Sequence, residues 1–269
     1  MASGKQSKRR RRAAQVASPP PVRRKGQRRR ASPRVLAAAA GVLALIIAAV
    51  ILGFTFSRGS SSPSTVPARG SLVNALPGAS QVQTLLKGIP QHGNVLGKPT
   101  APATIVEYID LQCPYCQQFE TQAMPALIQQ YVRTGKARVV MRPIAFIGPD
   151  SQLGRLAAIA AGKQHKMFNF AELLYVNQGV ENSGWLNDRN ITDAAASIPG
   201  LNVPQLLAGR NAAETKDQAA AFDRLSTKDA VSATPTILVG RSAGTLHRVT
   251  LASPSDAKSV AKALNKVLP

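Results

Sequence analysis

The stretch that decides the fold is "TIVEYIDLQCPYCQQFE", residues 104–120, which contains both cysteines of the 269-residue chain. Residues 103–110 are rich in β-branched and aromatic side chains, a composition typical of a buried strand. Pro114 suits the first position of a helix. The stretch therefore predicts a strand that runs directly into a helix, with Cys113 at the junction.

The two sulfurs are suited to reversible bond formation. A helix begins with unpaired N–H groups and a positive dipole end, and both favour a thiolate at Cys113. Cys116 follows three positions later, on the same side of the helix, so the sulfurs come within bonding range. Because such a pair can open and close without moving distant backbone, the spacing favours a redox-active pair.

Three other uses of the cysteines are compatible with the sequence. A purely structural disulfide would close a very small loop and stabilise the fold little. A zinc site needs four ligands, and His92, His165 and His247 are widely spaced in the sequence. The third alternative is that both thiols are in the core by chance. We favour redox catalysis, with no metal and no bound cofactor because the sulfurs themselves carry the electrons.

Further elements follow the first strand and helix. Pro125 predicts a kink in that helix, and residues 137–146 give a second strand signal. A helical stretch follows over about residues 150–225. Two more strands are expected at 235–240 and 246–251, then a C-terminal helix capped by Ser253 with Pro254 in its first position.

The N-terminal third has a different composition. Residues 1–34 hold 13 of the 34 Lys and Arg residues and no acid, so they account for much of the net charge of +21. Such a segment cannot bury enough apolar surface to fold, and we expect a disordered tail. Binding of nucleic acid or anionic lipid is the alternative use of this charge, but no aromatic residues are interleaved with it.

Residues 35–56 contain no charged or amide side chain, and as a helix they would reach roughly 33 Å, enough to cross a bilayer. A cleavable signal peptide would have a shorter apolar run that ends in small residues. The basic flank predicts a cytoplasmic N-terminus. We therefore expect a single-pass anchor in the plasma membrane, a flexible Ser-, Pro- and Gly-rich linker over 57–78, and an extracytoplasmic domain over 79–269.

Residues 104–120, the order of elements and "SATPTILVG" at 232–240 together resemble the DsbA-like thiol-disulfide oxidoreductases of the thioredoxin superfamily. The resemblance covers residues 79–268 and is greatest to the membrane-anchored actinobacterial branch. It implies an α/β thioredoxin-like fold with an inserted helical subdomain, preceded here by one transmembrane helix.

The resemblance also implies roles for single residues. Cys113 matches the nucleophile and Cys116 the resolving cysteine, while Pro114 and Tyr115 between them tune the thiolate. Pro235 matches a cis-proline, with Thr234 before it, whose loop binds an extended substrate segment. From the sequence alone, a trans proline at the start of a strand is the alternative.

Glu107 matches a buried acid that assists proton transfer at the resolving cysteine. A carboxyl group in an apolar strand has a raised pKa and suits acid/base work. A solvated glutamate that faces outward is the alternative. Asp110 fits the pattern of the relatives as well, but the sequence assigns it no role.

These features predict a dithiol oxidase that introduces disulfides into exported proteins. An isomerase or reductase on the same fold, or a chaperone-like module that binds peptides, are the alternatives. The expected partners are unfolded exported proteins that contain cysteines, and a membrane reoxidase of the DsbB or vitamin K epoxide reductase type, because the chain has no second cysteine pair. No nucleic acid is expected among them.

Overall fold

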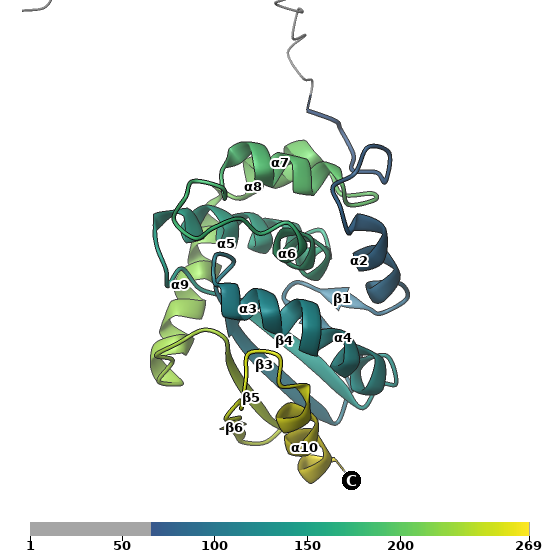
Figure 1. Cartoon of the computed structure of the whole chain (residues 1–269), viewed down its shortest axis with the longest axis vertical. Coiled ribbons are helices and arrows are strands. Elements are labelled where there is room, and N and C mark those ends of the chain that lie inside the picture. Colours follow the sequence, from purple (N-terminus) through teal and green to yellow (C-terminus); the bar gives the residue numbers. More distant parts are fainter. Residues whose placement is uncertain (1–65, 269) are drawn as a thin grey trace, which may run out of the picture. The chain divides into compact units, whose positions relative to one another are not determined.

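The computed structural model describes residues 66–268 of the chain (Figure 1). The predicted tail, the membrane span over 35–56 and the first part of the linker lie outside these residues. Within 66–268, no helix is both long and apolar enough to span a bilayer.

A six-stranded mixed sheet forms the centre of the domain, in the order β1-β2-β4-β3-β5-β6. β3 (Ala103–Ile109) pairs in parallel with β4 (Ala137–Pro143) and antiparallel with β5 (Thr236–Arg241). All seven residues of β3 are buried, as expected for a central strand covered on both faces. The outer strands are short: β1 (Gln91–His92), β2 (Val95–Leu96) and β6 (Leu246–Arg248).

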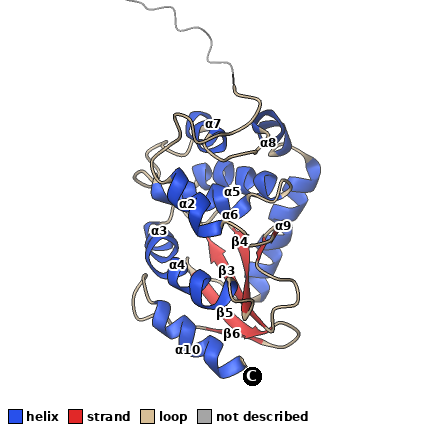
Figure 2. Cartoon of the chain, turned by 90° about the vertical axis from the view of Figure 1, so that its right-hand side faces the viewer, coloured by secondary structure: helices blue, strands red, loops and turns tan. Residues whose placement is uncertain are grey.

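Helices cover both faces of the sheet (Figure 2). The helix after the cysteines and α10 (Ala257–Val267) lie on one side, and α9 (Ala213–Lys228) lies on the other. Successive side chains of β3 alternate between these sides. The hydroxyl of Tyr108 donates to Asp229, at the end of α9, over 2.6 Å. Glu107 therefore faces the opposite side, where the cysteine-bearing helix lies.

The predicted helical stretch is present as five helices between β4 and β5, ending with α9. Its most apolar member is α6 (Met167–Val176), which is buried along nearly its whole length and packs against α2 (Ala79–Leu86) and α5. The architecture is therefore the expected thioredoxin-like α/β fold with an inserted helical subdomain. The other inserted helices are α5 (Pro149–Gly162), α7 (Asp188–Ala196) and α8 (Val203–Gly209).

The helix that carries the cysteines widens where a kink was predicted. α3 (Pro114–Gln118) continues into a π-helical turn, η1 (Phe119–Ala123), and then into α4 (Met124–Leu127) and η2 (Ile128–Val132). The N–H of Met124 bonds to the carbonyl of Phe119, five residues back. Pro125 has no N–H to continue the regular ladder, and the wider turn accommodates it.

One prediction needs correction, and one element was missed. Asp256 caps α10 by accepting from the N–H of Ser259 over 3.0 Å, so Ser253 is not the cap and Pro254 lies in the preceding loop. The antiparallel β1–β2 hairpin was not predicted, because strands of two residues leave no alternation to detect.

The chain makes ordered contacts upstream of residue 79, where we expected the domain to begin. The N–H groups of Gly70 and Ser71 donate to the carbonyls of Leu201 and Ala196, each over 2.8 Å. A Cβ atom on Gly70 would lie 2.2 Å from the carbonyl oxygen of Ile198. Only glycine fits this approach, so the segment before α2 lies directly on the helical insertion.

Candidate active site

Cys113 is the N-cap residue of α3, at the junction that the sequence predicts. Both cysteines are free thiols in this structure. The Cys113 sulfur accepts from the N–H of Cys116 over 3.4 Å and lies 3.3 Å from the carbonyl oxygen of Thr234. The peptide bond between Thr234 and Pro235 is cis. The loop before β5 therefore lies against the first sulfur.

The pKa values of the two thiols are shifted in opposite directions. The Cys116 side chain, which donates to the Cys113 sulfur, is the main cause that lowers the pKa of Cys113 to about 6. Burial opposes this shift, and Thr234 and the N–H groups of Cys116 and Tyr115 assist it. Burial, and then the Cys113 sulfur, raise the pKa of Cys116 well above its usual value. At pH 7 the first sulfur is therefore mainly a thiolate, and the second is a thiol.

The surface is hollowed beside Thr234, the residue whose carbonyl oxygen lies against the Cys113 sulfur. Tyr115 is 57 % exposed. It lines a surface hollow of ≈ 310 Å³ together with Thr234, Pro235 and residues 251–254. An extended chain in this hollow would lie beside the first sulfur. A larger hollow of ≈ 490 Å³ lies between β6 and α10, and none of the predicted site residues lines it.

Glu107 is fully buried in the middle of β3, with Met141 and Ile237 beside it on the neighbouring strands. No backbone, amide or hydroxyl donor reaches either of its carboxyl oxygens. Burial is the main cause that raises its pKa well above that of a solvated glutamate, and Glu120 adds to the rise. The alternative of an outward-facing, solvated side chain does not apply.

Two further buried acids on the same side were not singled out from the sequence. Glu120 lies in η1, one turn after Cys116, and Glu172 lies in α6. Glu172 did carry a signal, because it is the single charged residue in the apolar helix "MFNFAELLYV". Glu120 also carried one, as the residue four positions after Cys116 on the helix.

Asp110 holds the loop between β3 and Cys113. One carboxylate oxygen accepts from the N–H of Gln112 over 2.8 Å, and the other accepts from the N–H groups of Phe146 and Ile147 over 2.7 and 2.8 Å. These bonds tie the loop after β3 to the loop after β4. These bonds could not be predicted from the sequence, because Phe146 and Ile147 are distant from Asp110 along the chain.

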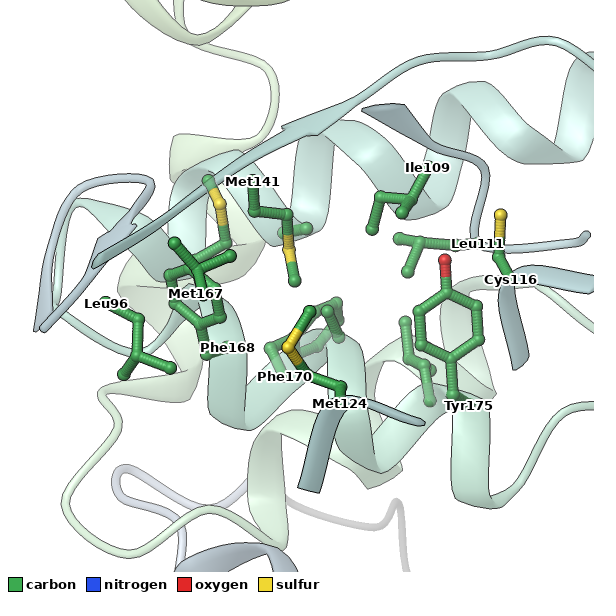
Figure 3. Close-up of a cluster of buried hydrophobic side chains, with 14 of the residues drawn as sticks. Leu96, Ile109, Leu111, Cys116, Met124, Met141, Met167, Phe168, Phe170 and Tyr175 are labelled. Carbon is green, nitrogen blue, oxygen red and sulfur yellow. The ribbon is translucent and has the colours of Figure 1, made fainter. Parts of the chain in front are cut away.

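Two side chains of the helical insertion donate hydrogen bonds to the same loop. The hydroxyl of Tyr175 donates to the carbonyl of Asp110 over 3.0 Å, and the side-chain amide of Gln178 donates to the carbonyl of Leu111 over 2.9 Å. Figure 3 shows the sulfur of Cys116 beside Leu111 and Tyr175, at one end of a cluster of buried apolar side chains. The position of the second sulfur therefore depends on the insertion as well as on the sheet.

Comparison with known proteins agrees with this geometry. The family model described as "Thioredoxin" matches residues 91–263. The chain belongs to the thioredoxin family. It is 29 % identical over 176 residues to a "Probable disulfide bond formation protein D" of Bacillus cereus, covering 64 % of this chain and 77 % of the relative. It is 28 % identical over 159 residues to the "Disulfide bond formation protein D" of Bacillus subtilis, covering 58 % and 70 %.

Among solved structures, the oxidised BdbD of Bacillus subtilis is similar to this thioredoxin-family chain with a TM-score of 0.57 and 24 % identity, over 66 % of this chain and 96 % of that one. That likeness concerns the fold. Together with the Cys-Pro-Tyr-Cys site and the relatives in sequence, it identifies a DsbA-like thiol-disulfide oxidoreductase.

Proposed function

We propose that the protein is an extracytoplasmic dithiol oxidase that introduces disulfides into exported proteins. The observation that carries this proposal is the contrast between the two sulfurs, with a Cys113 pKa of about 6 and a Cys116 pKa well above its usual value. A stabilised thiolate favours the reduced form of the pair, and this makes the Cys113–Cys116 disulfide an oxidant. The names of the Bacillus relatives support the same direction.

The reaction begins with the oxidised pair. A substrate thiolate attacks the Cys113 sulfur, the Cys113–Cys116 bond breaks, and its electron pair goes to Cys116. A second substrate thiolate then attacks the substrate sulfur of this mixed disulfide. The substrate leaves with its own disulfide, and Cys113 leaves as a thiolate that the N–H of Cys116 and the Cys116 thiol stabilise.

Other site residues have supporting roles in this proposal. The loop of Thr234 and Pro235 binds the substrate backbone in the hollow beside Cys113, where Tyr115 offers an exposed aromatic ring. Pro114 begins α3 and leaves the N–H of Cys116 free to reach the sulfur. Glu107 supplies the proton that Cys116 takes up when the disulfide opens, because its raised pKa keeps it protonated.

The surroundings of the domain belong to the same proposal. Residues 35–56 anchor the chain in the plasma membrane, and residues 1–34 remain in the cytoplasm. After each turnover the two cysteines are reduced, and the chain has no other cysteines to accept their electrons. A membrane reoxidase of the DsbB or vitamin K epoxide reductase type therefore restores the disulfide.

The test is to equilibrate the protein with glutathione buffers and to follow its turnover of a reduced, unfolded protein. A reduction potential of about −120 mV for the cysteine pair, with stoichiometric oxidation of the substrate, would support an oxidase. A reduction potential of about −270 mV would assign a reductase. Substrate binding without any thiol exchange would reject the enzyme and leave a peptide-binding module.

A further inference from the structure

Three carboxyl groups from separate elements meet in the core behind Cys116. Glu107 comes from β3, Glu120 from η1 and Glu172 from α6 of the helical insertion. α6 packs against both α3 and η1. Glu107 and Glu120 are fully buried, while Glu172 retains 3 % of its surface. The cluster therefore extends from the interior of the sheet to the edge of the insertion.

Within residues 66–268, no side-chain cation pairs with this cluster. Both oxygens of Glu107, both of Glu120 and Oε1 of Glu172 are enclosed, and no N–H or hydroxyl donor of another residue reaches them. Tyr175 also interacts with Glu120, and its phenol supplies no positive charge. Several charged side chains of α5 and α7 form ion pairs outside the cluster: Arg155 pairs with Asp223, Arg189 with Asp193, and Asp188 with Arg210.

Glu120 lies close enough to interact with both Glu107 and Glu172, and carboxyl groups this close in the core can bond only if protons are shared among them. Burial raises the pKa of all three, and that of Glu172 reaches about 8. The bond between Glu107 and Glu120 raises the pKa of the first and lowers that of the second, so Glu107 donates. The bond between Glu120 and Glu172 acts in the same sense, so Glu120 donates to Glu172.

Cys116 needs a route by which protons can pass between its sulfur and solvent. It is fully buried, and a substrate bonded to Cys113 would cover the mouth of the site. Glu120 follows Cys116 by one helical turn, which places the two side chains on the same side of the helix. Glu172 is the one member of the cluster with residual exposure.

We propose that Glu120 and Glu172 form a proton relay that connects Cys116 and Glu107 with solvent at the surface of α6. This deepens the proposed function and rests on it. When a substrate thiolate opens the Cys113–Cys116 bond, the new Cys116 thiolate takes a proton from the Glu107–Glu120 pair. The hydrogen bond between Glu120 and Glu172 then reverses, so that Glu172 passes its own proton to that pair and takes another from water. On reoxidation the proton returns to water by the same route.

The first test observes the carboxyl groups directly. The infrared difference spectrum between the oxidised and reduced full-length protein should contain C=O bands of protonated carboxyls that change with redox state. Glu172→Gln and Glu120→Gln should each remove a band, and the exposed Glu214→Gln should remove none. Bands that persist in both variants would overturn the relay.

The second test separates a relay from an electrostatic or structural role. Oxidised protein is mixed with a small dithiol, and the reaction is quenched by acid and alkylation. Glu172→Gln should slow both reduction and reoxidation about ten-fold and increase the solvent deuterium isotope effect, while the equilibrium constant with glutathione stays within about two-fold of wild type. An altered equilibrium constant with unchanged rates would overturn the relay.

These outcomes are distinct from failure of the proposed function. If the wild-type protein does not oxidise a reduced substrate, the oxidase proposal fails before any variant is compared. If the wild type is active and Glu172→Gln matches it in rate, isotope effect and infrared bands, the relay alone is rejected. Thermal unfolding of each variant shows whether the amide has been accommodated in the core.

Discussion

Cys113 and Cys116 are one helical turn apart, yet their surroundings differ in every respect that sets acidity. Around Cys113 are the N–H of Cys116, the thiol of Cys116 and an open hollow with Tyr115. Around Cys116 are buried apolar side chains such as Leu111 and the phenol of Tyr175 (Figure 3). The fold therefore makes one sulfur reactive partly by keeping its neighbour protonated.

Replacing either sulfur tests this division of roles most severely. Cys113→Ser should abolish oxidation of a reduced protein, because the attacked sulfur is lost. Cys116→Ser should also stop turnover but should retain a thiolate at Cys113. The variant is mixed with a substrate protein whose single thiol carries a leaving group, which the Cys113 thiolate displaces. Gel electrophoresis under non-reducing conditions should then show a long-lived mixed disulfide between the two proteins. Trapping through position 116 in the Cys113→Ser variant would reverse the assignment.

Stability against pH tests the buried side of the comparison. Carboxyls with raised pKa values bind more protons in the native than in the unfolded protein, so the free energy of unfolding should fall as pH rises from 5 to 9. For Glu172, a shift from 4.5 to about 8 corresponds to a loss on the order of 3–5 kcal/mol. Urea unfolding of the oxidised protein, in which neither cysteine titrates, measures this slope.

Glu172→Gln should flatten that slope, because a neutral amide has no proton to lose. Glu214→Gln is the matched control, since Glu214 is largely exposed. A slope that is identical in wild type and Glu172→Gln would mean that Glu172 is not protonated in the native state.

The loop that separates the two environments depends on Asp110. Asp110→Asn replaces an acceptor of three backbone N–H groups by an amide that can accept on one side only, and we expect a loss of about 2–3 kcal/mol in the free energy of unfolding. Chemical unfolding at pH 7 measures it. Asp217→Asn, an exposed position on α9, should change stability by less than about 0.5 kcal/mol.

The smallest effect is on the acidity of Cys113 itself. The rate of alkylation of the reduced protein should reach half its maximum near pH 6. In Cys116→Ala the midpoint should move to higher pH, because the thiol that donates to Cys113 is the main cause of the lowered pKa. An unchanged midpoint would assign the acidity to Thr234 and to the N–H groups of Tyr115 and Cys116.

The sequence was sufficient for the parts of the fold that are local. The strand before Cys113, the helix opened by Pro114 and the helical insertion each have their own composition and spacing. The π-helical turn around Glu120 was not predictable, since Pro125 signals an interruption without specifying its form. The cap of α10 was misassigned because Ser253 and Asp256 are both suitable cap residues.

The same difference between local and long-range contacts applies to the site residues. Cys113 and Cys116 were evident because their spacing on one helix decides their geometry. The buried cluster was not evident, because Glu172 reaches Glu120 only through the packing of α6 on η1. Asp110 likewise acquires its partners from a loop after another strand. What the sequence could not supply was contact between distant segments.

The segment around Gly70 decides where the domain can be shortened. It shields the carbonyls of Ala196 and Leu201 and the N–H of Val203, which would otherwise present unpaired backbone. A protein truncated to begin at residue 79 would expose that edge as a template for association with another chain. Biochemical work on the isolated domain is therefore best begun from residue 66 or earlier.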